Sequence, residues 1–260
     1  MSQKIIVCAT NYGVWGEELQ APWDALRKAG HHLTLATPQG KKPLPLTISV
    51  DPEFMDPMQH YQVNPPQVCA RIKELVAGKE WANPKRFKDV HMADYDAIVV
   101  AGGLGSMLDI GNNPALHRLL LDAYYADKLI GTICYANAVL VFTRDPKNNY
   151  KSIINGRQVT AHPRAWDFDV DLTYELYNPT PDNKGTDLVS PGFLFPLQDL
   201  VTDAVGPQGK CISIETANRE KPSVAYDWPF VTGTSVESSI AFGQKLVEVL
   251  ATRVEPVTTR

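Results

Sequence analysis

One cysteine in the middle of the chain stands where a catalytic nucleophile would stand. Cys134 follows the apolar run Leu129–Ile133, whose β-branched residues predict a buried strand, and it precedes 136–142, which is typical of the first turns of a buried helix. A thiol near a helix N-terminus is favoured as the nucleophilic thiolate, and a sharp strand-to-helix turn would expose it at the carboxyl edge of a sheet. The alternative interpretation is an inert buried cysteine.

A glycine-rich turn elsewhere in the chain could complete such a site. The predicted strand 96–101 runs into Gly102-Gly103-Leu104-Gly105-Ser106. Two glycines after a strand allow backbone N–H groups to face a bound oxyanion without obstruction by side chains. The phosphate-loop pattern GxxxxGK[ST] and the dinucleotide pattern GxGxxG are both absent here, so the turn indicates neither nucleotide nor dinucleotide binding.

Composition narrows the class of protein. The 260 residues are 44% hydrophobic and 21% charged, which is typical of a soluble globular protein, and the net charge of -4 favours no nucleic-acid partner. No apolar segment approaches the ~20 residues that span a bilayer, and a strand beginning at Ile5 leaves no room for a signal peptide. The four cysteines and six histidines show no metal-ligand spacing. We therefore expect a cytoplasmic protein with free thiols, without a metal, a cofactor or a membrane partner.

The elements that must position these residues alternate along the chain. We expect strands at 5–10, 32–37, 96–101, 129–133, 211–215, 223–226 and 230–233, and helices at 17–30, 67–77, 114–126, 136–142, 193–205 and 238–252. This alternation predicts an α/β fold with a doubly wound, mostly parallel sheet flanked by helices. Residues 151–161 are predicted to form an extra hairpin that turns at Asn155-Gly156. No repeat or linker divides residues 1–260, so a single domain is expected.

Two further segments are predicted to cover the site. The proline-rich stretch 39–66 is too long for a plain connection, and 162–191 is aromatic at first and then polar. We expect both segments to shape the pocket above Cys134.

The chain as a whole resembles the DJ-1/PfpI superfamily, in the larger branch that holds the Hsp31-type proteins. The motifs that carry the resemblance are GVWGEELQAP (13–22), LRKAG (26–30), ATPQG (36–40), YDAIVVAGGLGSM (95–107), TIC (132–134), GRQVT (156–160) and TG (232–233). They occur in the family's order and cover nearly the whole chain. The resemblance implies a flavodoxin-like fold, and it implies a homodimer.

The same resemblance assigns roles within the site. It identifies Cys134 with the family's reactive cysteine in a nucleophile elbow, and the spacing E-x-x-x-P identifies Glu18, four residues before Pro22, with the glutamate beside that sulfur. Glu17 is the less favoured neighbour. The family's oxyanion donors correspond to backbone N–H groups near Gly103 and Tyr135.

One departure puts the family's usual chemistry in doubt. Many members, including the glyoxalase-type Hsp31 proteins, carry histidine after the cysteine, whereas this chain has Tyr135. Tyrosine donates a hydrogen bond at neutral pH but is a poor base. His162 is a candidate replacement, and its alternative interpretation is a surface histidine at a hairpin end. The segment 232–238 (TGTSVES) also departs from the TGQNPxS stretch usual in Hsp31-like proteins.

Several other residues are candidates for lining a pocket. They are Leu104 beside the glycine turn, Tyr12 and Trp15 in the loop before the first helix, and Asn137 after the cysteine. Tyr12, Trp15 and Asn137 are equally compatible with ordinary packing.

Three functions follow from these residues. In the first, Cys134 adds to a small electrophilic substrate such as a nitrile, isocyanide, amide or activated carbonyl, and Glu18 carries protons, as in a hydrolase or a hydratase/lyase. Isocyanide hydratases of the superfamily also lack the adjacent histidine. The second is glyoxalase III-like conversion of 2-oxoaldehydes, with His162 or Tyr135 as the base. The third is a stress or redox-sensing protein with an oxidisable cysteine.

Overall fold

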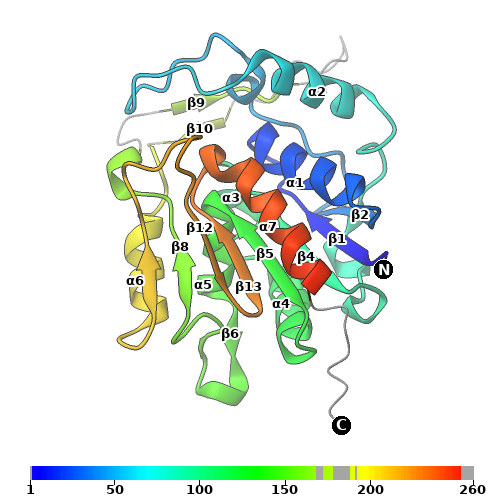
Figure 1. Ribbon diagram of the computed structural model, residues 1–260, viewed down its shortest axis with the longest axis vertical. Coiled ribbons are helices and arrows are strands. Elements are labelled where there is room, and N and C mark those ends of the chain that lie inside the picture. The colour runs from blue at the N-terminus through cyan, green and yellow to red at the C-terminus, as the bar shows by residue number, and fades with distance from the viewer. Residues whose placement is uncertain (1, 168–171, 178–187, 191, 253–260) are drawn as a thin grey trace.

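A seven-stranded sheet forms the centre of the computed structural model, which describes residues 2–167, 172–177, 188–190 and 192–252 (Figure 1). The strand order is β12-β13-β5-β4-β1-β2-β3, and every neighbouring pair is parallel except the antiparallel edge pair β12–β13. The strands are β1 (Lys4–Cys8), β2 (His32–Thr37), β3 (Lys85–Arg86), β4 (Ala97–Val100), β5 (Leu129–Ile133), β12 (Val224–Asp227) and β13 (Phe230–Gly233). The predicted mostly parallel, flavodoxin-like sheet is confirmed.

The sheet is buried on both faces. Every residue of β4 and β5, and all of β1 except Lys4, is buried, and these strands are continuous apolar runs rather than alternating ones. That pattern is the one expected of parallel strands covered on both sides. Helices α1 (Gly16–Lys28) and α7 (Ser239–Thr252) lie side by side across one face (Figure 1).

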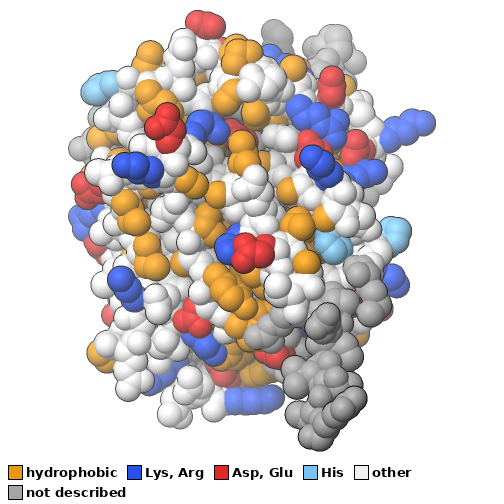
Figure 2. All heavy atoms as spheres, viewed as in Figure 1, with side chains coloured by type: hydrophobic (Ala, Val, Ile, Leu, Met, Phe, Trp, Pro, Cys, Tyr) orange, Lys and Arg blue, Asp and Glu red, His pale blue; other side chains and the backbone are white. Residues whose placement is uncertain are grey.

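The other helices complete the layers around the sheet. α4 (Pro114–Tyr125) packs on β4 and β5, α5 (Ala138–Phe142) packs on α4 and α6, and α2 (Pro66–Ala77) lies against α1. α3 (Ser106–Asp109) follows the glycine turn, and α6 (Leu197–Val205) begins after its N-cap residue Pro196. On the face shown in Figure 2, acidic and basic side chains are interspersed. Within the described ranges, no helix has the length and apolar character needed to cross a membrane.

The predicted hairpin over 151–161 is wrong. β7 (Lys151–Ser152) pairs antiparallel with β6 (Arg144–Asp145), whereas β8 (Gln158–Thr160) pairs in parallel with β11 (Lys210–Ile212). The chain does turn at Asn155-Gly156, but the turn does not join two paired strands. The Gly156 N–H instead donates a hydrogen bond to the carbonyl of Val205 in α6. The buried side chains of Ile153 and Ile154 hold this turn in the core.

Two irregular segments extend beyond the sheet. Residues 39–66 contain the 3-10 turn Thr47–Val50 and a bridge between Met55 and Gln62. In the segment 162–191, the structure describes the turn Arg164–Trp166 and the antiparallel pair β9 (Leu172–Tyr174) and β10 (Leu188–Ser190). The parts of that predicted cover at 168–171, 178–187 and 191 lie outside the described residues. That the whole chain forms one domain stays a prediction.

Candidate active site

Cys134 lies in a sharp turn at the carboxyl end of β5. Its φ of +56° places a non-glycine residue in the left-handed region, a conformation typical of nucleophile elbows. The turn approaches the β4 end closely, since a Cβ on Gly102 would lie 2.3 Å from the carbonyl oxygen of Ile133 and 2.9 Å from the Cβ of Cys134. Glycine at 102 therefore allows the elbow to pack against the neighbouring strand.

Two backbone amides face the sulfur. The N–H groups of Gly103 and Tyr135 form hydrogen bonds to Cys134, and these bonds favour its charged form. They are the donors that the resemblance implies for an oxyanion. Gly103 has φ +109°, and a Cβ there would lie 2.2 Å from the backbone nitrogen of Trp15. The glycine turn therefore carries one amide to the site and packs tightly on the loop before α1.

Replacing Gly103 with alanine is expected to destabilise the fold more than replacing Gly30 does. Both glycines have positive φ, but nothing lies within 4 Å of a Cβ on Gly30. Gly30→Ala should therefore lose only the backbone term, about 1–2 kcal/mol. Gly103→Ala should lose about 1–3 kcal/mol more from overpacking. Urea unfolding of both variants measures the difference, and equal losses would contradict the close approach of the turn.

Glu18, rather than Glu17, belongs to the site. The Glu18 side chain is 1% exposed, forms a hydrogen bond with Cys134, and has no partner for Oε2 among the described residues. Burial raises the pKa of Glu18 well above its ordinary value, and the charges of Glu237 and Glu17 raise it further, against the hydrogen bond from Cys134. Glu17 turns to the other side and pairs with Arg219 through two bonds of 2.7 and 2.6 Å.

The expectation that the helix N-terminus makes Cys134 a ready thiolate is wrong. Burial raises the pKa of Cys134 well above its ordinary value, and the charge of Glu18 and its hydrogen bond act in the same direction. The helix after the elbow is too short to offset this effect, because a 3-10 turn (Cys134–Asn137) comes first and α5 has five residues. The resting thiol therefore needs a proton acceptor.

A histidine–aspartate pair lies beside Tyr135. The Nδ1 atom of His162 is 3.1 Å from Oδ1 of Asp167, and the hydroxyl of Tyr135 donates to the same oxygen at 2.5 Å. The Tyr135 ring stacks on Phe193 with centroids 4.6 Å apart and contacts the His162 ring at 5.2 Å. Burial, and then the charge of Asp167, raise the pKa of Tyr135 far above its ordinary value, so its hydroxyl is a donor and not a base.

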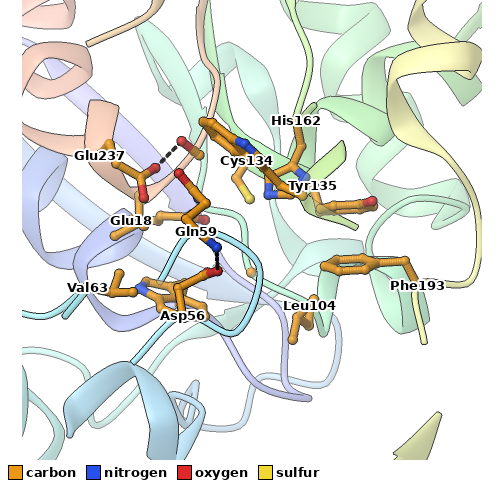
Figure 3. A pocket seen from close by; sticks show the side chains of 15 residues that line it. Glu18, Asp56, Gln59, Val63, Leu104, Cys134, Tyr135, His162, Phe193 and Glu237 are labelled. Carbon is orange, nitrogen blue, oxygen red and sulfur yellow. Dashed lines mark hydrogen bonds between the residues drawn. The ribbon is translucent and has the colours of Figure 1, made fainter. Parts of the chain in front are cut away.

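Cys134, Glu18, Tyr135 and His162 line one small pocket (Figure 3). Cys134 lies in the middle, with Glu18, Asp56 and Glu237 on one side and the rings of Tyr135, His162 and Phe193 on the other. The full lining is Trp15, Glu18, Asp56, Gln59, Val63, Gly103, Leu104, Cys134, Tyr135, His162, Trp166, Phe193, Ser235, Val236 and Glu237.

Seven of the nine predicted site residues therefore meet around one pocket: Cys134, Glu18, Tyr135, His162, Gly103, Leu104 and Trp15. The surface interpretation of His162 is not supported, because its side chain is 13% exposed. Which of these side chains take part in a reaction stays a prediction.

Asn137 and Tyr12 do not line the pocket. Asn137 is 1% exposed and joins three segments, because its amide donates to the carbonyls of Thr160 and Gly233 and its oxygen accepts from Thr132. These bonds hold the elbow against β8 and β13. The Tyr12 hydroxyl accepts a hydrogen bond from Gln39 at 3.1 Å in an exposed position, and Tyr12 is not among the residues that line the pocket.

The sequence interpretation missed other residues of the site. Asp167 follows His162 by five residues, a spacing that could have marked a base with its orienting carboxylate. Glu237 lies in the segment 232–238 that departs from the family pattern, and that departure was the available signal. Asp56, Gln59 and Val63 come from 39–66, and nothing in their spacing marks them. Within the described residues, no group of three or more His, Cys, Asp or Glu side chains could hold a metal.

Comparison with known proteins defines the class. The family model described as ThiJ/PfpI family-like matches residues 9–164, more than half of the chain, and this protein belongs to that family. The resemblance to the DJ-1/PfpI superfamily is confirmed.

Three relatives illustrate the similarity. The glutathione-independent glyoxalase of Schizosaccharomyces pombe is 23% identical over 58% of this chain and 59% of its own length. The structure of the Francisella tularensis rapid encystment protein of 24 kDa has a TM-score of 0.71 at 21% identity, over 95% of this chain and 99% of that chain. Glyoxalase III of Candida albicans has a TM-score of 0.60 at 18% identity, over 95% and 96% of the two chains. The chain spans little more than half the length of the curated relatives it matches.

Proposed function

We propose that this protein is a cysteine-dependent enzyme that converts a small 2-oxoaldehyde into the corresponding 2-hydroxy acid. The observation that carries the proposal is the His162–Asp167 pair, in which His162 lines the same pocket as Cys134 and Glu18. It supplies the imidazole that the residue after the cysteine lacks. The similarity to a fission yeast protein named as a glutathione-independent glyoxalase supports the same reaction.

The first step is addition of the thiol to the aldehyde. His162 takes the proton of Cys134 as the sulfur bonds to the aldehyde carbon, because an imidazole exchanges protons near neutral pH. The carbonyl oxygen develops negative charge, which the N–H groups of Gly103 and Tyr135 stabilise. Glu18 is held protonated by burial and gives that oxygen a proton. The product is a hemithioacetal on Cys134.

The second step moves a hydrogen between two carbons. A base removes the proton from the former aldehyde carbon, the electrons shift through an enediol, and the neighbouring carbon is protonated. The first carbon is thereby oxidised and the second reduced, so no external oxidant is needed. The proton that His162 took from Cys134 first passes through solvent to the carboxylate of Glu18, which leaves the imidazole neutral. Asp167 accepts a hydrogen bond from Nδ1–H of His162, so Nε2 is available as the base for this transfer.

The last step is hydrolysis. The thioester on Cys134 is attacked by water, the carbon–sulfur bond breaks, and the thiol regains a proton. The same amides stabilise the oxyanion of this step. The second candidate is a related hydrolase or hydratase reaction on a nitrile, isocyanide or amide substrate. The placement of the Gly103 and Tyr135 N–H groups and of Glu18 around the sulfur favours this reaction, because it needs no base besides these groups.

Product analysis separates the candidates. We expect the purified protein to convert methylglyoxal to lactate without glutathione, and in D2O the lactate should carry solvent deuterium at the carbon next to the carboxylate. Proton NMR measures both. Turnover of nitriles, isocyanides or amides without lactate formation would favour the second candidate. Absence of turnover throughout, with selective peroxide oxidation of Cys134, would replace both with a redox-sensing role.

A further inference from the structure

A second buried carboxylate faces the pocket. Glu237 lies in the 3-10 turn Val236–Ser238 after β13 and is 5% exposed. It accepts hydrogen bonds from the hydroxyls of Tyr61 and Ser235. Hydroxyl donors are neutral, so they orient the carboxylate without neutralising it. Nothing in the proposed reaction uses Glu237.

The charges around the pocket do not balance. The charge of Arg219 acts on Glu237, but the hydrogen bonds of this guanidinium go to both carboxylate oxygens of Glu17 and, at 2.7 Å, to the carbonyl of Val63. Among the described lining residues there is no lysine or arginine, whereas Asp56, Glu237 and Glu18 all contribute carboxyl groups. Asp56 is fixed at the mouth by accepting the N–H groups of Met58 and Gln59 at 2.8 and 2.7 Å.

The opposite side of the pocket is aromatic. Figure 3 shows Tyr135, His162 and Phe193 across Cys134 from Asp56 and Glu237. Trp166 extends this side, with its ring centroid 5.7 Å from that of His162. Aromatic faces opposite carboxylates form the arrangement that recognises organic cations. The Oε2 atom of Glu18, buried and without a partner among the described residues, is a further polar group prepared for a ligand.

We propose that the pocket selects electrophiles that carry a positively charged organic group, such as an ammonium or guanidinium, and that Glu237 and Asp56 are the residues that determine this preference. The charged end would lie between these carboxylates and the aromatic side while the electrophilic carbon meets Cys134. The proposal rests on the proposed function only in requiring that Cys134 be a reactive nucleophile. It also predicts discrimination against phosphorylated or carboxylated substrates.

Such a substrate would activate the site that binds it. Burial disfavours the thiolate of Cys134, and the neighbouring carboxyl of Glu18 acts in the same direction. Glu237 and Cys134 line the same pocket, so a cation bound there would add an opposite charge to the surroundings of the sulfur, which favours the thiolate.

The test uses three reagents that share one reactive group and differ in charge. They are the 2-(trimethylammonio)ethyl, ethyl and 2-sulfonatoethyl methanethiosulfonates. Each thiolate attack forms a mixed disulfide on Cys134 and releases methanesulfinate, and peptide mass spectrometry gives the rate. Each rate is divided by that of the same reagent with 2-mercaptoethanol. At low salt we expect the cationic reagent to exceed the anionic one by at least about tenfold after this correction.

Variants assign the effect to particular carboxylates. Glu237→Gln and Asp56→Asn keep their hydrogen-bond acceptors, and each should lower the cation-to-anion ratio at least about threefold, the size expected for loss of one nearby charge. Glu53→Gln is the matched control, because Glu53 is an exposed acid of the same segment that does not line the pocket, and its ratio should stay unchanged. Thermal unfolding checks each fold. If Glu237→Gln fails to fold, the cation-to-anion ratio of Asp56→Asn alone decides whether the carboxylates cause the preference.

The outcomes distinguish this proposal from the proposed function. Equal corrected rates for the three reagents, or an equal fall of the ratio in Glu53→Gln, would overturn the cation preference and leave the nucleophile intact. Failure of the neutral reagent to modify Cys134 would overturn the nucleophile itself.

Discussion

Turnover by the Glu18→Gln variant is expected to fall about 10²–10⁴-fold below that of the wild-type enzyme, the usual contribution of a positioned proton donor. Glutamine keeps the shape of the side chain and its place in α1, but it cannot give a proton to the oxygen of the adduct. The fold should be retained, because the glutamine amide can still contact the sulfur. Steady-state kinetics on methylglyoxal, or on whichever substrate proves active, measures the loss in kcat.

The matched control for this variant is Glu248→Gln. Glu248 is 61% exposed on α7 and pairs with Lys245, so its loss removes the same charge far from the pocket. Its turnover should stay within about twofold of wild type, as surface changes usually have small effects. A Glu18→Gln enzyme with wild-type turnover would remove Glu18 as the proton carrier.

The His162→Ala variant is expected to lose a comparable factor, about 10²–10⁴ in kcat, if His162 is the base. Tyr135→Phe should cost less than about tenfold, since the phenolic hydroxyl is only a donor to Asp167 and the backbone N–H of residue 135 is retained. Added imidazole should restore part of the activity of His162→Ala, because the vacated space can admit the missing base. Kinetics with and without imidazole measures both effects.

The reverse order of effects would reject this assignment. A nearly silent His162→Ala together with a severe Tyr135→Phe would show that the tyrosine carries the proton. Two nearly silent variants with a severe Glu18→Gln would favour the hydrolase or hydratase reaction, in which the cysteine and the acid suffice.

The parts of the site that are local in sequence were predictable. The apolar run before Cys134 gives β5 its observed bounds, Leu129–Ile133, and a strand that stops at a turn places its last side chain at the sheet edge. Glu18 could be preferred over Glu17 from its spacing to Pro22 in the family pattern. In α1, which begins at Gly16, the two neighbours do face different partners, Cys134 and Arg219.

Contacts between distant segments were not predictable in the same way. Arg219 binds Glu17 across 202 positions of sequence, and Tyr61 meets Glu237 across 176. Neither pair has a periodicity or a local motif. The hairpin prediction failed for the same reason. β7 pairs with β6 and β8 pairs with β11, and the buried Ile153 and Ile154 lie between β7 and β8 in the sequence.

The reactivity of the sulfur also depends on the whole fold. The position of Cys134 before a helix favours the thiolate, but burial and the carboxyl of Glu18 act against that charge. The local sequence predicts the turn, but it does not predict how far the folded chain removes Cys134 from water. The carboxylate side of the pocket could not be predicted from local sequence either, because Asp56 and Glu237 lie far apart in the chain.

The most direct measurement of the central claim is the mass of the adduct that forms on the protein. The His162→Ala enzyme, incubated with methylglyoxal until addition reaches equilibrium and then quenched in acid, should carry one substrate molecule on the peptide that contains Cys134. Loss of the base slows this addition without changing its equilibrium, whereas the later proton shift is blocked. The peptides of Cys8, Cys69 and Cys211 should be unmodified, and a Cys134→Ser protein should show no adduct. An active enzyme whose Cys134 peptide never carries substrate mass would contradict covalent catalysis by this cysteine.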